Sequence, residues 1–247
     1  MKHYTSVKRY GSSIFHRFIQ DGTHYSERVS FSPTLFVSSN EETNWKTIKG
    51  IPVKPKRFHS ITDAQAFVKS MDGIEPKVIH GIRDYELLYI HETYPDDIRF
   101  DFHSLKYFFL DIETDSKGEW PDPKTAQKEI NAITVYDSST KKYHSFYTVK
   151  ALNVKSGDNR LLMLCRDEIE LLREFILFWS KNYPDIASGW NSNGFDYPYI
   201  VSRVLRMLGE DFVGKLSPWG RVSSKEVRND FGTDTQIAVE ILDIDLS

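Results

Sequence analysis

Apolar and polar residues alternate most regularly after residue 105, and this pattern predicts three β-strands in succession. They are expected over residues 105–113 (LKYFFLDIE), 130–139 (INAITVYDSS) and 142–149 (KYHSFYTV), because the side chains of a strand point alternately to its two faces. The last two strands meet at a short polar segment, residues 137–139, which is typical of a hairpin.

Two segments of the same half have the apolar spacing of helices instead. Residues 167–183 (DEIELLREFILFWSKNY) carry acids in the first turn, where the helix dipole favours them, and Pro184 follows. Residues 198–209 (PYIVSRVLRMLG) predict a second helix that ends at Gly209, and residues 187–191 between the helices predict a short strand. Strands followed by alternating helices and strands predict an α/β fold with a mixed sheet.

The first hundred residues have a different texture. Short strands separated by Gly, Asn and Pro turns are expected over residues 13–19, 29–37 and 86–94, and one helix is expected over residues 62–71 with Thr62 as its N-cap. This pattern predicts a small mixed α+β domain.

Composition agrees with a folded chain of one or two domains, since 40% of the 247 residues are hydrophobic and 14% are aromatic. We expect domains at residues 1–104 and 105–247, packed together because no Gly- and Ser-rich linker separates them. No apolar run approaches the roughly 18 residues of a membrane span, and Cys165 is the single cysteine. We therefore expect a cytoplasmic protein without a membrane partner. The net charge of −3 leaves the partner open.

The strand at residues 105–113 ends in acids, Asp111 and Glu113. Strand alternation places both on one face, about 7 Å apart at a rise of about 3.3 Å per residue. Two such carboxylates repel each other unless a cation offsets the repulsion, and oxygen ligands of this kind suit Mg²⁺ or Mn²⁺. A pair of ions held in this way can promote phosphodiester hydrolysis. The alternative is a solvated strand end without a metal.

A third acid, Asp196, lies in a Gly- and Asn-rich turn before the second helix. Free N–H groups and the positive end of the helix dipole should keep its carboxylate ionised and available to a metal. The alternative is that Asp196 only caps the helix.

FFLDIETD (108–115) resembles the first exonuclease motif of family B DNA polymerases, and GWNSNGFDYPYIVSR (189–203) resembles the second. WPDPKTAQKEINAITVYDS (120–138) and FSPTLFV (31–37) are similar to the polymerases of T-even-like bacteriophages. The resemblance extends over almost the whole chain, and its two exonuclease motifs are the specific part.

The resemblance implies a ribonuclease-H-like 3′–5′ proofreading exonuclease domain preceded by the N-terminal domain of the polymerase family. It implies two Mg²⁺ or Mn²⁺ ions, with Asp111 bridging both, Glu113 holding the ion that activates the attacking water, and Asp196 holding the other. The implied localisation is the cytoplasm of the infected host cell.

The resemblance also implies contacts with nucleic acid. Phe195, Asn191 and Trp190 are expected to contact the single-stranded 3′ end of DNA, with Phe195 against a terminal base. Residues 221–242 alternate around Asn229, Asp230 and Gly232 and predict a hairpin, which in this family helps to part primer from template. The alternative for this segment is an ordinary surface hairpin.

One family feature is absent from the sequence. A third motif, Tyr-x-x-x-Asp, should supply a last carboxylate after residues 241–247 (ILDIDLS), and no polymerase motif is present. The chain is therefore expected to be an excised fragment, or half of a polymerase completed by a C-terminal polypeptide, and weakly active or inactive alone. A different hypothesis is a module that binds RNA or single-stranded DNA without catalysis through aromatic residues of its first hundred positions.

Overall fold

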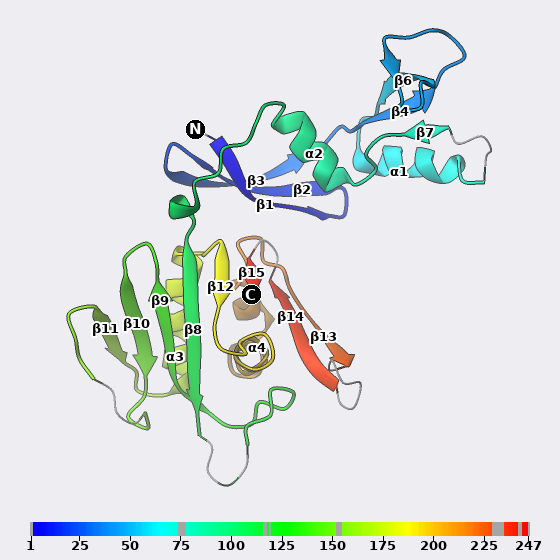
Figure 1. The fold of residues 1–247 in the computed structure, drawn as a ribbon. Helices are drawn as coiled ribbons and strands as arrows, with labels where there is room; N and C mark the ends of the chain where they lie inside the picture. Colours follow the sequence, from blue (N-terminus) through cyan, green and yellow to red (C-terminus); the bar gives the residue numbers. More distant parts are fainter. Residues whose placement is uncertain are drawn as a thin grey trace. The chain divides into compact units, whose positions relative to one another are not determined.

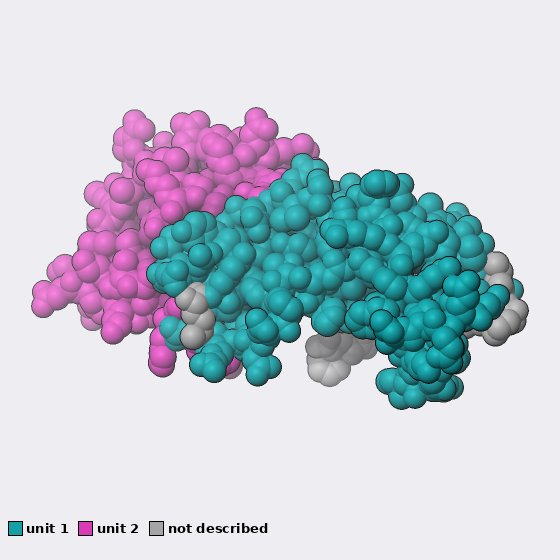
Figure 2. All heavy atoms as spheres, turned by 90° about the horizontal axis from the view of Figure 1, so that it is seen from above, with its two compact units in different colours: residues 1–101 teal, residues 102–247 magenta. Residues whose placement is uncertain are grey.

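The computed structural model of the protein describes residues 2–73, 78–115, 118, 120–151, 155–228, 235–241 and 244–246. The chain divides into two compact units, Met1–Asp101 (unit 1) and Phe102–Ser247 (unit 2), coloured separately in Figure 2. Each unit contains a hydrophobic core of its own.

The described part of unit 1 contains two antiparallel sheets and two helices. In sheet order the first has β1 (Lys2–Tyr10), β2 (Ser13–Gln20) and β3 (Thr23–Ser30). The second has β5 (Trp45–Lys46), β6 (Pro52–Arg57), β4 (Thr34–Ser38) and β7 (Ile79–His80). The expected strand at residues 29–37 is thus divided between the end of β3 and β4.

The two helices of unit 1 are α1 (Ile61–Ser70) and α2 (Tyr85–Thr93). Helix α1 is capped by Ser60, which accepts a hydrogen bond from the Asp63 N–H, so the expected cap at Thr62 was wrong by two residues. The expected strand at residues 86–94 was wrong, because this segment is α2.

The reason for the helix at α2 is its first turn and its apolar spacing. The Asp84 side chain accepts hydrogen bonds from the Glu86 and Leu87 N–H groups, and buried residues recur at helical spacing: Tyr85, Leu88 and Tyr89. A side-chain cap and an apolar period of about 3.6 residues therefore favour a helix for this segment.

The main sheet of unit 2 has six strands among the described residues. Its order is β11 (Arg160–Leu164), β10 (Lys142–Tyr147), β9 (Ile130–Asp137), β8 (Tyr107–Thr114), β12 (Ile186–Ser188) and β15 (Asp245–Leu246). Strand β9 pairs antiparallel with β8 and β10, whereas β10–β11, β8–β12 and β12–β15 are parallel. The expected mixed α/β fold is confirmed.

Helix α3 (Glu168–Lys181) lies behind β8 and β9 in Figure 1, and α4 (Asp196–Leu208), drawn beside β12, contributes to the same core. The inward residues of β8 pack with them in the core: Phe108, Leu110 and Ile112. Cys165 is buried at the edge of the same core, and burial raises the pKa of its thiol to about 11, which suits a structural residue.

Short elements complete unit 2: the 3-10 turn η1 (Phe102–Ser104), α5 (Glu210–Gly214), β13 (Val222–Arg228) and β14 (Thr235–Ile241). Strands β13 and β14 pair antiparallel, which confirms the expected hairpin. Its expected turn residues Asn229, Asp230 and Gly232 lie outside the described residues. The described helices include none that is long and apolar enough to cross a membrane.

Candidate active site

Strand β8 carries the first two predicted site residues on its outer face, the side away from α3 and α4. Asp111 and Glu113 are exposed, whereas Leu110 before them and Ile112 between them are buried. The prediction that both acids lie on one face of the strand is therefore confirmed. The pairing of β8 with β9 is interrupted between Glu113 and Thr114. Such irregularities in a ladder redirect side chains and are common beside functional sites.

Asp196 reaches this strand from helix α4, of which it is the first residue. Its Oδ1 atom accepts a hydrogen bond of 3.0 Å from the Ile112 N–H, and only 4% of the residue is exposed. Ile112 lies between Asp111 and Glu113 in the chain, so this bond fixes the third predicted acid at the segment that carries the other two.

Burial changes the ionisation of both aspartates. Burial raises the pKa of Asp196 to about 6, with a further increase from the nearby Asp111 carboxylate and a decrease from the Ile112 N–H. Burial also raises the pKa of Asp111. We expected the helix start to favour the charged form of Asp196; loss of water outweighs that effect here.

Two close aspartates with raised pKa values suit a divalent cation, because a cation compensates the repulsion between them and accepts hard oxygen ligands. Glu113 does not complete a group of three: within the described part of the chain, no three Asp, Glu, His or Cys side chains gather closely enough to hold an ion. The carboxylates of Asp111 and Asp196 therefore fit a divalent cation, whereas the described residues alone do not form a complete set of metal ligands.

The turn before α4 depends on a glycine that approaches β8 very closely. A Cβ atom at Gly189 would lie 2.3 Å from the backbone oxygen of Leu110, far inside van der Waals contact. Asn191 has a φ of 54°, and its backbone oxygen accepts hydrogen bonds from the Gly194 and Phe195 N–H groups. These two residues shape the turn that delivers Asp196 to β8.

The three residues predicted to contact nucleic acid lie in different settings. Trp190 is 94% exposed and lines an open pocket of about 450 Å³ together with Phe109 and Asp111. Asn191 is exposed in the turn. Phe195 is half-buried and stacks on Tyr199 with ring centroids 5.4 Å apart. Trp190 thus lies beside Asp111, whereas Phe195 packs along its own helix.

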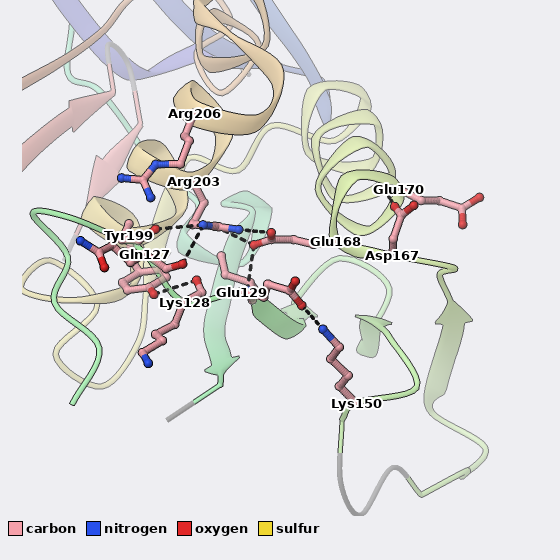
Figure 3. Close-up of polar contacts among 12 residues, drawn as sticks. Gln127, Lys128, Glu129, Lys150, Asp167, Glu168, Glu170, Tyr199, Arg203 and Arg206 are labelled. Carbon is pink, nitrogen blue, oxygen red and sulfur yellow. Dashed lines mark hydrogen bonds and ion pairs between the residues drawn. The ribbon is translucent and has the colours of Figure 1, made fainter. Parts of the chain in front are cut away.

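Sequence reasoning missed a buried ion pair that holds α4 to the rest of the site. Arg203, two turns after Asp196, pairs with Glu168 of α3, and its Nε donates to Glu168 Oε1 at 2.7 Å (Figure 3). The same carboxylate oxygen accepts from the Ile130 N–H at 2.8 Å. The signal that could have found it is a single arginine among the apolar positions of α4, matched by an acid at the first position of α3.

Helix α4 also binds the segment that joins β8 to β9. Nη1 of Arg203 donates to the carbonyl oxygen of Ala126 at 3.0 Å and to that of Gln127 at 3.3 Å. The Tyr199 hydroxyl donates to the Lys128 carbonyl at 2.9 Å (Figure 3). The Ser202 hydroxyl donates to the Pro123 carbonyl at 3.1 Å. One helix therefore presents Asp196 to β8 and fixes the segment through which β8 continues.

Comparison with known proteins places this site in a family. A family model described as DNA polymerase family B, exonuclease domain, matches residues 55–246. The chain is 33% identical to the DNA-directed DNA polymerase of Enterobacteria phage T4, over 93% of this chain and 28% of the relative. It is 30% identical to that of Escherichia phage RB69, over 98% of this chain and 30% of the relative.

A more distant match is the DNA polymerase of Archaeoglobus fulgidus, 29% identical over 55% of this chain and 15% of the relative. The chain thus spans less than a third of the length of the phage relatives. From the two motifs we expected the N-terminal part of a family B polymerase similar to those of phages, and these matches confirm that expectation. The chain belongs to the family B DNA polymerases and carries their exonuclease domain.

Proposed function

We propose that the protein is the N-terminal part of a replicative DNA polymerase and that unit 2 is its proofreading 3′–5′ exonuclease. The observation that carries this proposal is the 3.0 Å bond between Asp196 Oδ1 and the Ile112 N–H. It brings the acid of the second motif to the strand of the first, in a chain of the exonuclease family.

The proposed metal ligands are Asp111, Glu113 and Asp196, which would hold two Mg²⁺ or Mn²⁺ ions. Such ions supply an activated water at neutral pH and stabilise the leaving oxygen of a cleaved phosphodiester. By family resemblance, Asp111 would help to hold both ions, Glu113 the ion that activates the water, and Asp196 the other ion. The β8 backbone fixes the position of the Asp196 carboxylate, and the exposed face of β8 leaves Asp111 and Glu113 open to substrate.

The proposed partners are the single-stranded 3′ end of DNA and primer–template DNA, inside the infected host cell. Trp190 is the predicted contact that fits this role best, because its exposed ring lies in the pocket that Asp111 lines. In this proposal, the main role of Asn191 and Phe195 is to shape the turn and the start of α4. The remaining carboxylate and the polymerase activity come from the polypeptide that carries the rest of the enzyme.

The test follows the shortening of a 5′-labelled single-stranded oligonucleotide with Mn²⁺, with and without a separately made polypeptide that carries the rest of the polymerase. We expect cleavage from the 3′ end that is weak for residues 1–247 alone and strong in the mixture. Asp111→Asn and Asp196→Asn should each lower the rate at least a hundredfold. The control is Asp72→Asn in unit 1, which should leave the rate unchanged.

Metal-independent cleavage, or full activity in Asp196→Asn, would contradict the proposal. Strong activity of the lone chain would contradict the incomplete site but not the exonuclease assignment. The alternative, a binding module without catalysis, predicts that both variants still bind the oligonucleotide. It also predicts no shortening with or without the second polypeptide.

A further inference from the structure

The connection between β4 and β6 in unit 1 forms an exposed hairpin that the proposed function does not use. Strand β5 pairs antiparallel with the start of β6, and Trp45 pairs with Val53. In Figure 1 this segment projects above β4 and β6, away from α1. We call residues 45–57 (WKTIKGIPVKPKR) the basic hairpin.

Three large apolar side chains of the basic hairpin are open to solvent. Trp45 is 56% exposed, Ile51 is 42% exposed, and Ile48, in the loop, is fully exposed. Because Trp45 pairs with Val53, strand alternation places Trp45 and Ile51 on the same face of the hairpin. Single apolar residues are normal on a protein surface, whereas a cluster of large ones indicates an interaction site.

Hydrogen bonds within the loop hold these side chains in place. The Thr47 N–H donates to the Ile51 carbonyl at 2.9 Å, and the Gly50 N–H donates to the Thr47 carbonyl at 2.8 Å. Gly50 has a φ of 80°, which glycine adopts without strain. The Trp45 ring packs on Phe36, with centroids 5.3 Å apart. A loop that is already ordered loses little conformational entropy when a partner binds.

The backbone of the basic hairpin is closed to strand addition at Trp45. Strand β5 is the edge of its sheet, and an edge strand normally offers its free N–H and C=O groups to another chain. Here the Trp45 N–H donates to Thr43 Oγ1 at 3.2 Å, and the Thr43 hydroxyl donates to the Trp45 carbonyl at 2.7 Å. A partner is therefore recognised by the side chains of the hairpin.

The charge of the basic hairpin selects an anionic partner. The hairpin contains no Asp or Glu and has five exposed cations, in a chain with a net charge of −3: Lys46, Lys49, Lys54, Lys56 and Arg57. Among the described residues, the carboxylate that pairs with one of them is that of Glu42, whose Oε2 lies 3.3 Å from Lys46 Nζ. Positive charge concentrated in this way attracts acidic groups.

The apolar side chains distinguish between the possible anionic partners. Single-stranded nucleic acids stack successive bases on several aromatic rings. The basic hairpin has one such ring, Trp45, whereas Ile48 and Ile51 are aliphatic and offer no flat face. Aliphatic and aromatic side chains among lysines instead complement a peptide in which acids flank apolar residues.

We propose that the basic hairpin is the docking surface for an acidic segment of a partner protein. Apolar side chains of that segment pack on Trp45, Ile48 and Ile51, and its carboxylates pair with Lys49 in the loop and with Arg57. Strand alternation places Arg57 on the same face as Trp45, because both positions are in register with Val53. This inference concerns unit 1 and does not depend on the proposed exonuclease.

The experiment follows the fluorescence anisotropy of a labelled acidic peptide, EDDFDELDDE, mixed with residues 1–247. We expect saturable binding that weakens as salt is added, because exposed charges are screened. Trp45→Ser should weaken binding at least tenfold, and Lys49→Glu and Arg57→Glu at least fivefold each. Ile48→Ser, at a fully exposed position, should also weaken it at least fivefold. A peptide with Ser in place of Phe and Leu should bind at least fivefold more weakly than the first.

Matched controls lie elsewhere in unit 1. Leu87→Ser removes a 55% exposed leucine from α2, and Lys69→Glu reverses an exposed charge on α1. Both should leave peptide binding unchanged, and all variants should keep the circular dichroism spectrum and urea midpoint of the parent chain. Asp111→Asn should abolish hydrolysis of the oligonucleotide and leave peptide binding intact, which separates this proposal from the proposed function.

Each other outcome counts against the proposal. Unchanged peptide binding by Trp45→Ser and Ile48→Ser would overturn it. Tighter binding of an oligo-dT strand that the same variants lose would assign the basic hairpin to nucleic acid, and tighter binding to phosphatidylserine vesicles would assign it to a membrane surface. Displacement of the peptide by a polypeptide that carries the rest of the polymerase would place the hairpin inside the assembled enzyme.

Discussion

At the scale of single residues, the environment of Arg203 combines full burial with complete pairing. Its guanidinium group contacts the Glu168 carboxylate and the carbonyl oxygens of Ala126 and Gln127. Both charged side chains are 5% exposed. A buried charge is tolerated only when its partners are present, so each member of this set depends on the other.

Arg203→Met should therefore lower the free energy of unfolding by about 3–5 kcal/mol, because it leaves the Glu168 carboxylate buried without its cation. The double variant Arg203→Met, Glu168→Gln should recover part of that loss. Urea unfolding followed by tryptophan fluorescence measures both. Arg173→Met on the same α3 layer is the control, and a loss below about 1 kcal/mol for Arg203→Met would contradict a paired, buried charge.

Single residues of the site could be proposed from the sequence, but their contacts could not. Asp111, Glu113 and Asp196 could be proposed as ligands from the sequence because acids at a strand end and at a helix start stand out against apolar neighbours. Their distances and pKa values could not be predicted, because the contact of Asp196 with Ile112 spans 84 residues of sequence. The same holds for Glu168 and Arg203, 35 residues apart, since nothing in either segment identifies the other as partner.

At the scale of elements, regular patterns were read correctly and irregular ones were not. The strands β8, β9 and β10 and the helix α3 have long periodic patterns and were predicted close to their bounds. Strand β11 was missed, since residues 160–164 (RLLML) lack alternation, and α2 was mistaken for a strand. Tertiary contacts decide such short segments, and local propensity alone does not.

The approach of Gly189 to β8 gives an element-scale prediction. Gly189→Ala would place a Cβ atom 2.3 Å from the Leu110 oxygen, so the turn after β12 would have to move away from β8. We expect a loss of stability of about 2 kcal/mol or more, in the range of overpacked cores, and weaker exonuclease activity in the completed enzyme.

The control for this prediction is Gly157→Ala, where the nearest atom is the flexible side chain of Arg160 at 3.6 Å. That change should alter stability by less than about 1 kcal/mol. Thermal unfolding of the two variants provides the comparison. Equal midpoints would show that the backbone at Gly189 yields without cost.

At the scale of the whole molecule, two separate cores indicate two folding units. One core includes Phe108, Phe175 and Trp179 of unit 2, and the other includes Ile14, Leu35 and Ile61 of unit 1. We propose domains at residues 1–104 and 105–247, and the compact units of the structure divide three residues earlier, after Asp101. A chain whose cores share no residue should unfold in more than one step.

Residues 102–247 expressed alone should therefore fold, with a cooperative thermal transition. The full chain should show a second transition that is absent from this piece. Circular dichroism and calorimetry measure both. A piece without a cooperative transition would mean that unit 1 is required for the core of unit 2.

Helix α4 has a consequence for how such sequences can diverge. Asp196 at its first residue meets β8, and Arg203 two turns later meets Glu168. Each inserted or deleted residue would rotate one contact relative to the other by about 100° and shift it by about 1.5 Å along the axis. Because most side chains between these two positions are buried as well, the helix can keep both contacts only if the number of residues between Asp196 and Arg203 stays the same.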